Sequence, residues 1–113
     1  MEKTIVIDGK QVRFKSTAAT PLRYKAQFHK DYLVEIIKLN SLGKLDKENI
    51  DSGNINDLDF EVFYNIAWTL AKTADPSISD PITWLDDFEE FPLLDILPEL
   101  MDLIMSTIQG KKK

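Results

Sequence analysis

The chain has 113 residues, of which 43% are hydrophobic and 29% charged, so we expect residues 1–113 to form one small globular domain. It contains no cysteine, which excludes disulfide bonds, thiolate catalysis and metal centres with cysteine ligands. No apolar run approaches the roughly 20 residues of a membrane span, and the first residues lack the apolar stretch of a signal peptide. We therefore expect a cytoplasmic protein that does not enter a membrane.

The formal charge changes sign along the chain. Residues 1–45 hold nine Lys or Arg and four acids, a net +5, whereas residues 46–109 hold two Lys and fifteen acids, a net −13, and Lys111 to Lys113 add +3 to give −5 overall. The basic part is not rich in Arg and the acidic part would repel phosphate, so nucleic-acid binding is not expected. Oppositely charged parts of two copies favour head-to-tail self-association; a polarised but solvated surface is the alternative.

Residues 1–16 have the pattern of a β-hairpin. Two strand-like segments, residues 4–7 and 10–15, flank Asp8-Gly9, a dipeptide that supplies the positive φ angles of a tight type I′ turn. Apolar and polar residues alternate in the second segment, as expected of a half-buried strand. Because an isolated hairpin is marginally stable in water, this one must pack on helices or pair with another chain.

The next predicted element is one helix over residues 20–40. Thr20 is a favoured N-cap residue, and Pro21 has the preset φ angle of a first helical residue. One mostly apolar face follows the spacing of three to four residues: Leu22, Ala26, His29, Leu33, Ile36, Ile37 and Asn40. Residues 44–56 are rich in turn formers and poor in apolar anchors, so they are expected to form a mobile connection.

Residues 57–109 are predicted to form an acidic helical part. Asp57 is a favourable N-cap for its first helix, and Asp75-Pro76 is expected to end that helix. The centre of the helix is almost wholly apolar, which makes it the candidate for the central buried helix. Its main stripe consists of Phe60, Phe63, Ala67, Leu70 and Ala74.

Two further helical segments complete the prediction. Asp80 is expected to cap a short helix that begins at Pro81, and Pro98 either kinks the last helix or starts a new one. Gly110 is expected to end the last helix and leaves residues 110–113 as a basic tail. The expected fold class is therefore α+β, mostly α, with an N-terminal β-hairpin followed by about four helices.

The sequence shows no constellation of catalytic or metal-ligating residues. His29 is the sole histidine and lacks a partner in a Ser or Cys motif, so we interpret it as structural. The Gly53 loop is not an EF-hand, because Ile50 and Asp59 replace an oxygen ligand and a bidentate Glu. We predict no cofactor, no metal and no enzyme activity. One group of acids is interpreted as solvated rather than as an acid–base pair: Asp86, Asp87, Glu89 and Glu90.

The last predicted helix carries a candidate binding surface. Two methionines among Leu and Ile form an adaptable apolar stripe of the kind that binds varied helices. The stripe consists of Leu97, Met101, Ile104 and Met105. Packing in the core is the alternative explanation of the same pattern.

Three stretches of the chain carry a family resemblance. Immediately after the hairpin, residues 15–28 read KSTAATPLRYKAQF, residues 67–72 read AWTLAK, and residues 81–85 read PITWL and are followed by Phe88. These stretches, which are distributed between residues 15 and 88, resemble the tail assembly chaperones of long-tailed phages and prophages of Gram-positive bacteria.

This resemblance implies a non-enzymatic protein that coats the long, helical, aggregation-prone tape measure protein and promotes assembly of the tail tube around it. We expect the methionine-containing stripe to bind this client. Self-association would join basic residues of one copy to acidic residues of the next: Arg13, Lys15, Arg23 and Lys25 to Asp86, Asp87, Glu89 and Glu90.

The resemblance also implies a longer form, made by a frameshift, that recruits the tail-tube protein. Lys111 to Lys113 are encoded only by A-rich codons, on which a ribosome can slip. A solvated basic tail that favours the negative end of the helix dipole is the alternative. Two other classes of protein stay open, a structural head–tail or tube component and a regulatory protein-binding module.

Overall fold

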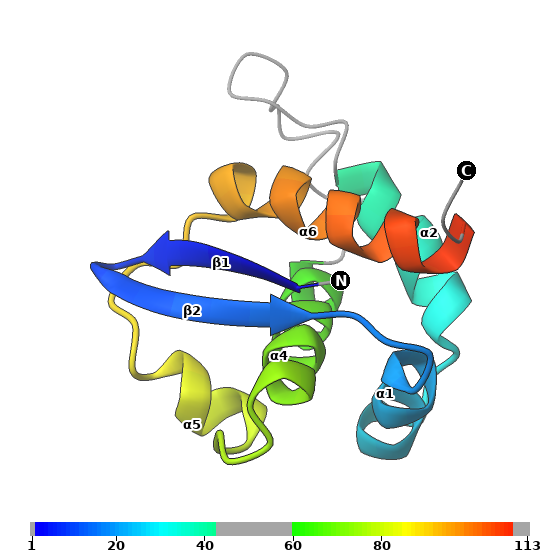
Figure 1. Cartoon of the computed structure of the whole chain (residues 1–113), viewed down its shortest axis with the longest axis horizontal. Helices are drawn as coiled ribbons and strands as arrows, with labels where there is room; N and C mark the ends of the chain where they lie inside the picture. Colours follow the sequence, from blue (N-terminus) through cyan, green and yellow to red (C-terminus); the bar gives the residue numbers. More distant parts are fainter. Residues whose placement is uncertain (1, 43–59, 110–113) are drawn as a thin grey trace.

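The computed structural model describes residues 2–42 and 60–109, which form an α+β structure that is mostly helical (Figure 1). This confirms the predicted fold class. The predicted connection at 44–56, the Asp57 cap and the 110–113 tail lie outside the described residues. A hairpin precedes five helices in the described ranges: β1 (Glu2–Ile7), β2 (Lys10–Lys15), α1 (Thr20–Phe28), α2 (Tyr32–Leu42), α4 (Phe60–Ala74), α5 (Pro81–Leu85) and α6 (Leu93–Gln109).

The hairpin forms as predicted. β1 and β2 are antiparallel, with Ile7 opposite Lys10, so the turn contains only Asp8 and Gly9. Asp8 has a φ angle of 54° and Gly9 one of 76°, which is the type I′ geometry that matches the twist of the two strands. Alternate side chains of the hairpin enter the core, and the most buried are Ile7, Val12 and Phe14.

The predicted single helix over residues 20–40 is wrong, because the chain forms two helices there. His29 adopts a left-handed conformation with a φ angle of 60°, and its N–H donates to the carbonyl of Lys25 at 2.8 Å, which ends α1. Asp31 then starts α2, since its carboxylate accepts from the N–H of Leu33 at 2.9 Å. The two helices therefore have separate axes, and apolar residues that one helix would have aligned differ in exposure, since Ile36 is buried and Ile37 is exposed.

The start of α1 also differs from the prediction. Thr20 is the first helical residue, and the N-cap position belongs to Ala19, which makes no side-chain capping bond. The Oγ1 of Thr20 instead accepts from the N–H of Thr17 at 2.9 Å. This hydroxyl therefore closes the turn between β2 and α1. Pro21 is therefore the second helical residue, one position later than predicted.

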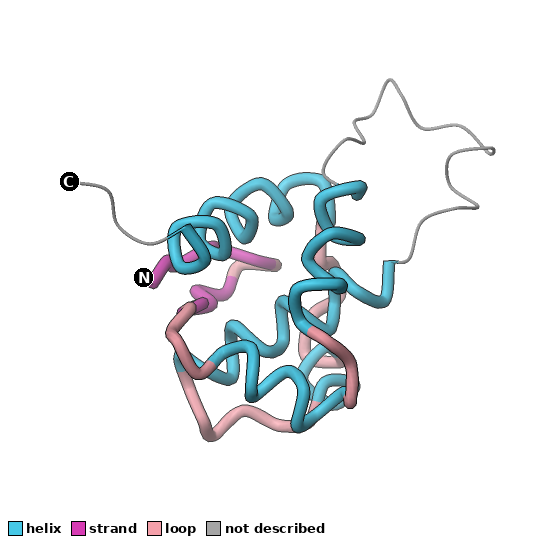
Figure 2. Tube along the Cα trace, turned by 90° about the vertical axis from the view of Figure 1, so that its right-hand side faces the viewer, coloured by secondary structure: helices cyan, strands magenta, loops and turns pink. Residues whose placement is uncertain are grey.

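The central buried helix is α4, as predicted. The hairpin, α1, α2, α5 and α6 all contact it and surround it (Figures 1 and 2). The buried Thr69 hydroxyl donates a hydrogen bond to the carbonyl of Asn65, in the same helix, at 2.8 Å. The helix ends at Ala74, just before Asp75-Pro76. Its buried residues are Val62, Phe63, Asn65, Ile66, Ala67, Trp68, Thr69, Leu70, Ala71 and Ala74.

The last two helices follow the predicted order. The Asp80 carboxylate caps α5 by accepting from the N–H of Thr83 at 3.3 Å. Helix α6 is one helix that continues through Pro98. It lies along β1 (Figure 2), where Lys3 Nζ is 2.7 Å from Glu99 Oε1, and this hydrogen bond raises the pKa of Lys3.

Candidate protein-binding surfaces

The client-binding stripe predicted on the last helix is largely part of the core. Leu97 is 2% exposed and Ile104 is fully buried, so neither side chain reaches the surface. Met101 packs against the core and Met105 is half-buried. Placing all four residues on a free surface was therefore wrong, and core packing explains the spacing. The physical reason is that α6 contacts both β1 and α4, which buries the side of the helix that carries Leu97 and Ile104.

The four basic residues predicted for self-association do not form one surface. Arg13 is already engaged within the chain, because its Nε donates to Glu2 at 2.9 Å and its Nη2 donates to the carbonyl of Ala74 at 2.7 Å. This second bond satisfies an end carbonyl of α4. Lys25 is exposed on α1, Lys15 is half-buried at the end of β2, and Arg23 is half-buried with an Nε that has no hydrogen-bond partner among the described residues.

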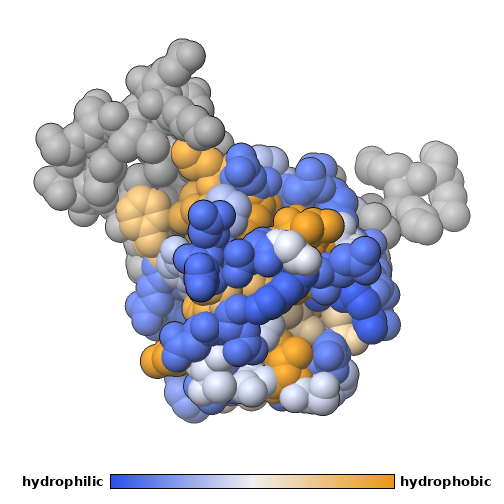
Figure 3. All heavy atoms as spheres, turned by 90° about the vertical axis from the view of Figure 1, so that its left-hand side faces the viewer, coloured by the Kyte–Doolittle hydropathy of each residue, from blue (hydrophilic) through white to orange (hydrophobic). Residues whose placement is uncertain are grey.

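The four acidic residues do lie together, between α5 and α6. All four side chains are exposed, while the main chain beneath them is held to the hairpin turn. Lys10 Nζ donates to the carbonyl of Asp87, and the N–H of Glu89 donates to the Asp8 carboxylate at 3.0 Å. This end of the molecule, seen in Figure 3, is mostly hydrophilic, with hydrophobic residues in separate patches. In Figure 1 it lies at the opposite side from α1.

An exposed apolar surface lies on α1 and α2 instead, which we call the α1–α2 patch. Leu22 is 74% exposed on α1, and on α2 the exposed fractions are 57% for Leu33, 50% for Val34 and 69% for Ile37. A shallow groove of about 370 Å³ runs between the two helices and is lined by Pro21, Leu22, Lys25, Asp31, Tyr32 and Leu33. Monomeric proteins rarely leave such neighbouring apolar side chains in water without a binding role.

The sequence pattern concealed this patch. A single helix over 20–40 placed Leu22, Leu33 and Ile37 on one inward face, whereas the break at His29 turns all three outward. The signal that could have revealed the break is Asp31, a favoured N-cap residue in the middle of the proposed helix.

A buried polar pair lies beneath the patch. The Tyr24 hydroxyl donates to Oε1 of Glu35 at 2.7 Å, and the Glu35 side chain is only 2% exposed. Lys38 Nζ lies 3.4 Å from the other carboxylate oxygen of Glu35. The Tyr32 hydroxyl is buried without a hydrogen-bond partner in the described part of the chain, and burial raises the pKa of this phenol. The two helices are therefore joined by a polar contact as well as by aromatic rings.

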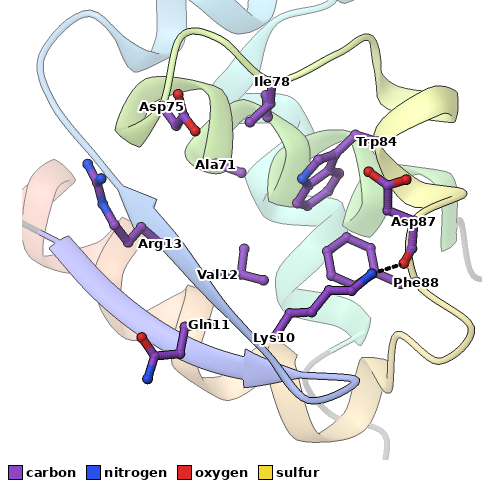
Figure 4. Close-up of a pocket in the computed structure, with 10 residues that line it drawn as sticks. All are labelled: Lys10, Gln11, Val12, Arg13, Ala71, Asp75, Ile78, Trp84, Asp87 and Phe88. Carbon is purple, nitrogen blue, oxygen red and sulfur yellow. Dashed lines mark hydrogen bonds between the residues drawn. The ribbon is translucent and has the colours of Figure 1, made fainter.

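A second groove, which we call the β2–α5 groove, lies between the outer edge of β2 and the segment from the end of α4 to α5 (Figure 4). Its volume is about 430 Å³. Figure 4 shows the Lys10 and Val12 side chains pointing toward Trp84 and Phe88. Apolar residues form the floor of the groove: Val12, Ala71, Ile78, Trp84 and Phe88. Charged residues form its rim: Lys10, Arg13, Asp75 and Asp87.

The described residues contain no group of three or more His, Asp or Glu placed to hold a metal ion, and none of their helices is long and apolar enough to cross a membrane. Comparisons of the chain with family models, with curated proteins and with solved structures found no match. Arguments about function therefore depend on the two grooves, the charge distribution and the resemblance of the three sequence stretches.

Proposed function

We propose that the protein is a non-enzymatic phage tail assembly chaperone, which binds and solubilises the tape measure protein and promotes assembly of the tail tube around it. The α1–α2 patch is the observation that carries this proposal. It provides an apolar surface for a client helix, in place of the stripe on α6 that the sequence suggested. The resemblance of residues 15–28 to tail assembly chaperones supports the same function.

The patch suits an amphipathic helix of the client. Leu33 and Ile37 are one helical turn apart and both are exposed, so they form a short ridge, and Leu22 borders the groove beside it. A helix that lays its apolar face into such a groove is held by side chains at similar spacing. Exposed Lys25 lines the groove, and Lys30 and Lys38 are exposed in the same stretch of chain, so a client helix with acidic flanks is favoured.

A client-solubilisation experiment tests the role of the patch. The chain is co-expressed with the tape measure protein, and the soluble fraction of the client is measured for wild type and for Leu33→Asp/Ile37→Asp. We expect the double variant to fold, because both residues are exposed, and to leave the client insoluble. Ile82→Asp is the matched control, since Ile82 is 74% exposed on α5, far from the patch. Equal solubilisation by the double variant and the control would contradict the proposal.

Head-to-tail self-association is the second part of the proposed function. The acidic residues between α5 and α6 and the basic residues Lys15, Arg23 and Lys25 belong to opposite sides of the molecule, which favours an open chain of copies. Arg13 is left out because Glu2 and Ala74 already engage it.

Salt dependence tests this association. Exposed charges are screened over about 8 Å at physiological ionic strength, so oligomers seen by light scattering should shrink as salt rises. Lys25→Glu should have the same effect at low salt, and Glu89→Lys should partly restore association when the two variants are mixed. A monomer at high concentration and low salt would contradict self-association.

As a chaperone, the protein would act in the cytoplasm of the bacterial host and be absent from the mature virion. A structural head–tail or tube component would instead persist in purified virions, and a regulatory module would form a fixed complex with a host protein. A frameshifted longer form would bring in the tail-tube protein. The codons of Lys111 to Lys113 decide this last point, since a frameshift needs a slippery heptamer and an open frame beyond it.

A further inference from the structure

The outer edge of β2 presents main-chain hydrogen-bonding groups to the β2–α5 groove. In a hairpin with a two-residue turn, the residues that flank the turn form a hydrogen-bonded pair, here Ile7 and Lys10. Pairs alternate along an antiparallel ladder, so the N–H and C=O groups of Gln11 and Arg13 point away from β1. Within residues 2–42 and 60–109, neither residue makes a backbone hydrogen bond outside the hairpin. Both residues line the groove.

The opposite wall of the groove is held in place by side chains of α4. Trp68 Nε1 donates to the carbonyl of Ser79 at 2.8 Å, and Lys72 Nζ donates to the carbonyl of Ile78 at 2.9 Å. These two bonds fix the segment between α4 and α5. Trp84 and Phe88 stack edge to face beside it, with ring centroids 5.3 Å apart. The groove is therefore formed before any ligand arrives.

We propose that the β2–α5 groove binds an extended acidic segment of a partner protein, which adds to the edge of β2 as a third, antiparallel strand. The main chain of this segment pairs with the free N–H and C=O groups of Gln11 and Arg13. Strand addition of this kind obtains its affinity from main-chain hydrogen bonds and its specificity from the alternate side chains. The inference does not depend on the α1–α2 patch.

Two cations of β2 define where the partner carries acids. Lys10 Nζ and Arg13 Nη2 each reach across the groove to a main-chain carbonyl, of Asp87 and of Ala74 respectively. A carboxylate is a stronger acceptor for such cations than a neutral carbonyl, so one acid of the partner replaces the Asp87 carbonyl at Lys10 Nζ and the other replaces the Ala74 carbonyl at Arg13 Nη2, while Arg13 Nε keeps its bond to Glu2. Lys10 and Arg13 are three positions apart and project from opposite faces of the strand (Figure 4), so the acids are also three positions apart.

The apolar floor defines a third position. A partner residue opposite Val12 projects on the same side as the Val12 side chain, toward Trp84 and Phe88. In an antiparallel strand, the order along the partner is therefore acid, apolar, any residue, acid. The first acid lies opposite Arg13 and the second opposite Lys10.

The probe is the synthetic peptide acetyl-TELTET-amide, added to the isotopically labelled full chain. Saturable shifts of the Gln11 and Arg13 amide signals and slower hydrogen exchange at both N–H groups are expected. A peptide N-methylated at the central Thr, whose N–H pairs with β2, should bind at least tenfold more weakly. Methylation of the Leu nitrogen is the matched control, because that N–H points away from β2 and its loss should change affinity little.

A second pair of variants tests the protein side. Gln11→Pro removes an outward N–H without removing a hydrogen bond between β1 and β2, and we expect it to abolish peptide binding. Val6→Pro is the control, because Val6 is the cross-strand partner of Gln11 and its N–H points outward at the edge of β1, so the same backbone constraint is introduced away from the groove. Unchanged amide exchange at saturating peptide, equal affinity of the two N-methylated peptides, or binding by Gln11→Pro at wild-type strength would each overturn the proposal. Replacement of both Glu by Lys in the peptide should also abolish binding.

Discussion

The hairpin and the α1–α2 pair both pack apolar side chains in the core around α4, but their further contacts differ. The hairpin is tied by polar bonds to main-chain groups, since Arg13 and Lys10 donate to carbonyls of Ala74 and Asp87, and Asp8 accepts from the N–H of Glu89. The α1–α2 pair is held together by ring contacts, and one further ring contact joins it to α4. Tyr24 lies 4.8 Å from Phe28 and 5.3 Å from Tyr32 between centroids, and Phe28 meets Trp68 edge to face at 5.7 Å.

The difference determines what each region offers to a partner. Polar bonds join Lys10 to the Asp87 carbonyl and Arg13 to the Ala74 carbonyl, and the β2–α5 groove lies between these two bonds. Ring packing on the other side uses one face of each short helix and leaves the next face apolar in water. The first region therefore presents main-chain groups and charge, and the second presents apolar side chains.

The largest expected change in the free energy of unfolding distinguishes a core residue from a residue of the α1–α2 patch. Phe14→Ala removes a fully buried ring from the face of the hairpin that packs on α4, so we expect it to lower the free energy of unfolding by about 3–5 kcal/mol. Leu22→Ala, at a side chain 74% exposed, should change it by less than about 0.5 kcal/mol. Urea unfolding of both variants measures this contrast. Equal losses would mean that the α1–α2 patch is structural rather than free.

A smaller effect is expected at the buried polar pair. Tyr24→Phe keeps the ring but removes the donor to the Glu35 carboxylate, so we expect a loss of about 1–3 kcal/mol. Tyr32→Phe is the matched control, because the Tyr32 hydroxyl is buried and has no partner in the described part of the chain, so its removal should be neutral or stabilising. If both variants lost the same stability, the hydrogen bond to Glu35 would not hold the two helices together.

Sequence reasoning located most elements because their signals are local. Asp8-Gly9 specifies its turn, the apolar centre of α4 predicts burial, and Asp80 caps α5 through its own carboxylate. It failed at His29, where a residue without the usual helix-ending chemistry takes a positive φ. It also could not tell whether apolar spacing on α6 faced a partner or the core, since periodicity reports a shared face and not what covers that face.

The left-handed conformation of His29, which ends α1, gives a further prediction about stability. A non-glycine residue at positive φ carries strain that glycine avoids, so His29→Gly should stabilise the α1–α2 pair by about 0.5–1 kcal/mol. His29→Ala keeps the Cβ atom and should give no gain. Denaturant midpoints of the two variants provide the comparison. Equal midpoints would show that the left-handed conformation costs little here.

The smallest expected effect is a pH dependence of stability that arises from Asp80, the N-cap residue of α5. Hydrogen bonds from the side chain and the N–H of Thr83 hold the pKa of Asp80 below its ordinary value of 3.8. A carboxyl with a lowered pKa in the folded state stabilises the fold at pH values above its unfolded pKa, and this stabilisation is lost as the pH falls through the folded pKa.

Asp80→Asn keeps a good cap without the charge, so its melting temperature should fall less than that of wild type below pH 3.8. Asp86→Asn is the matched control, because it removes a charge at the other end of α5, where residue 86 caps the helix through its backbone N–H and not through its carboxylate. The same acid response in Asp80→Asn and wild type would contradict a stabilising role for the ionised cap.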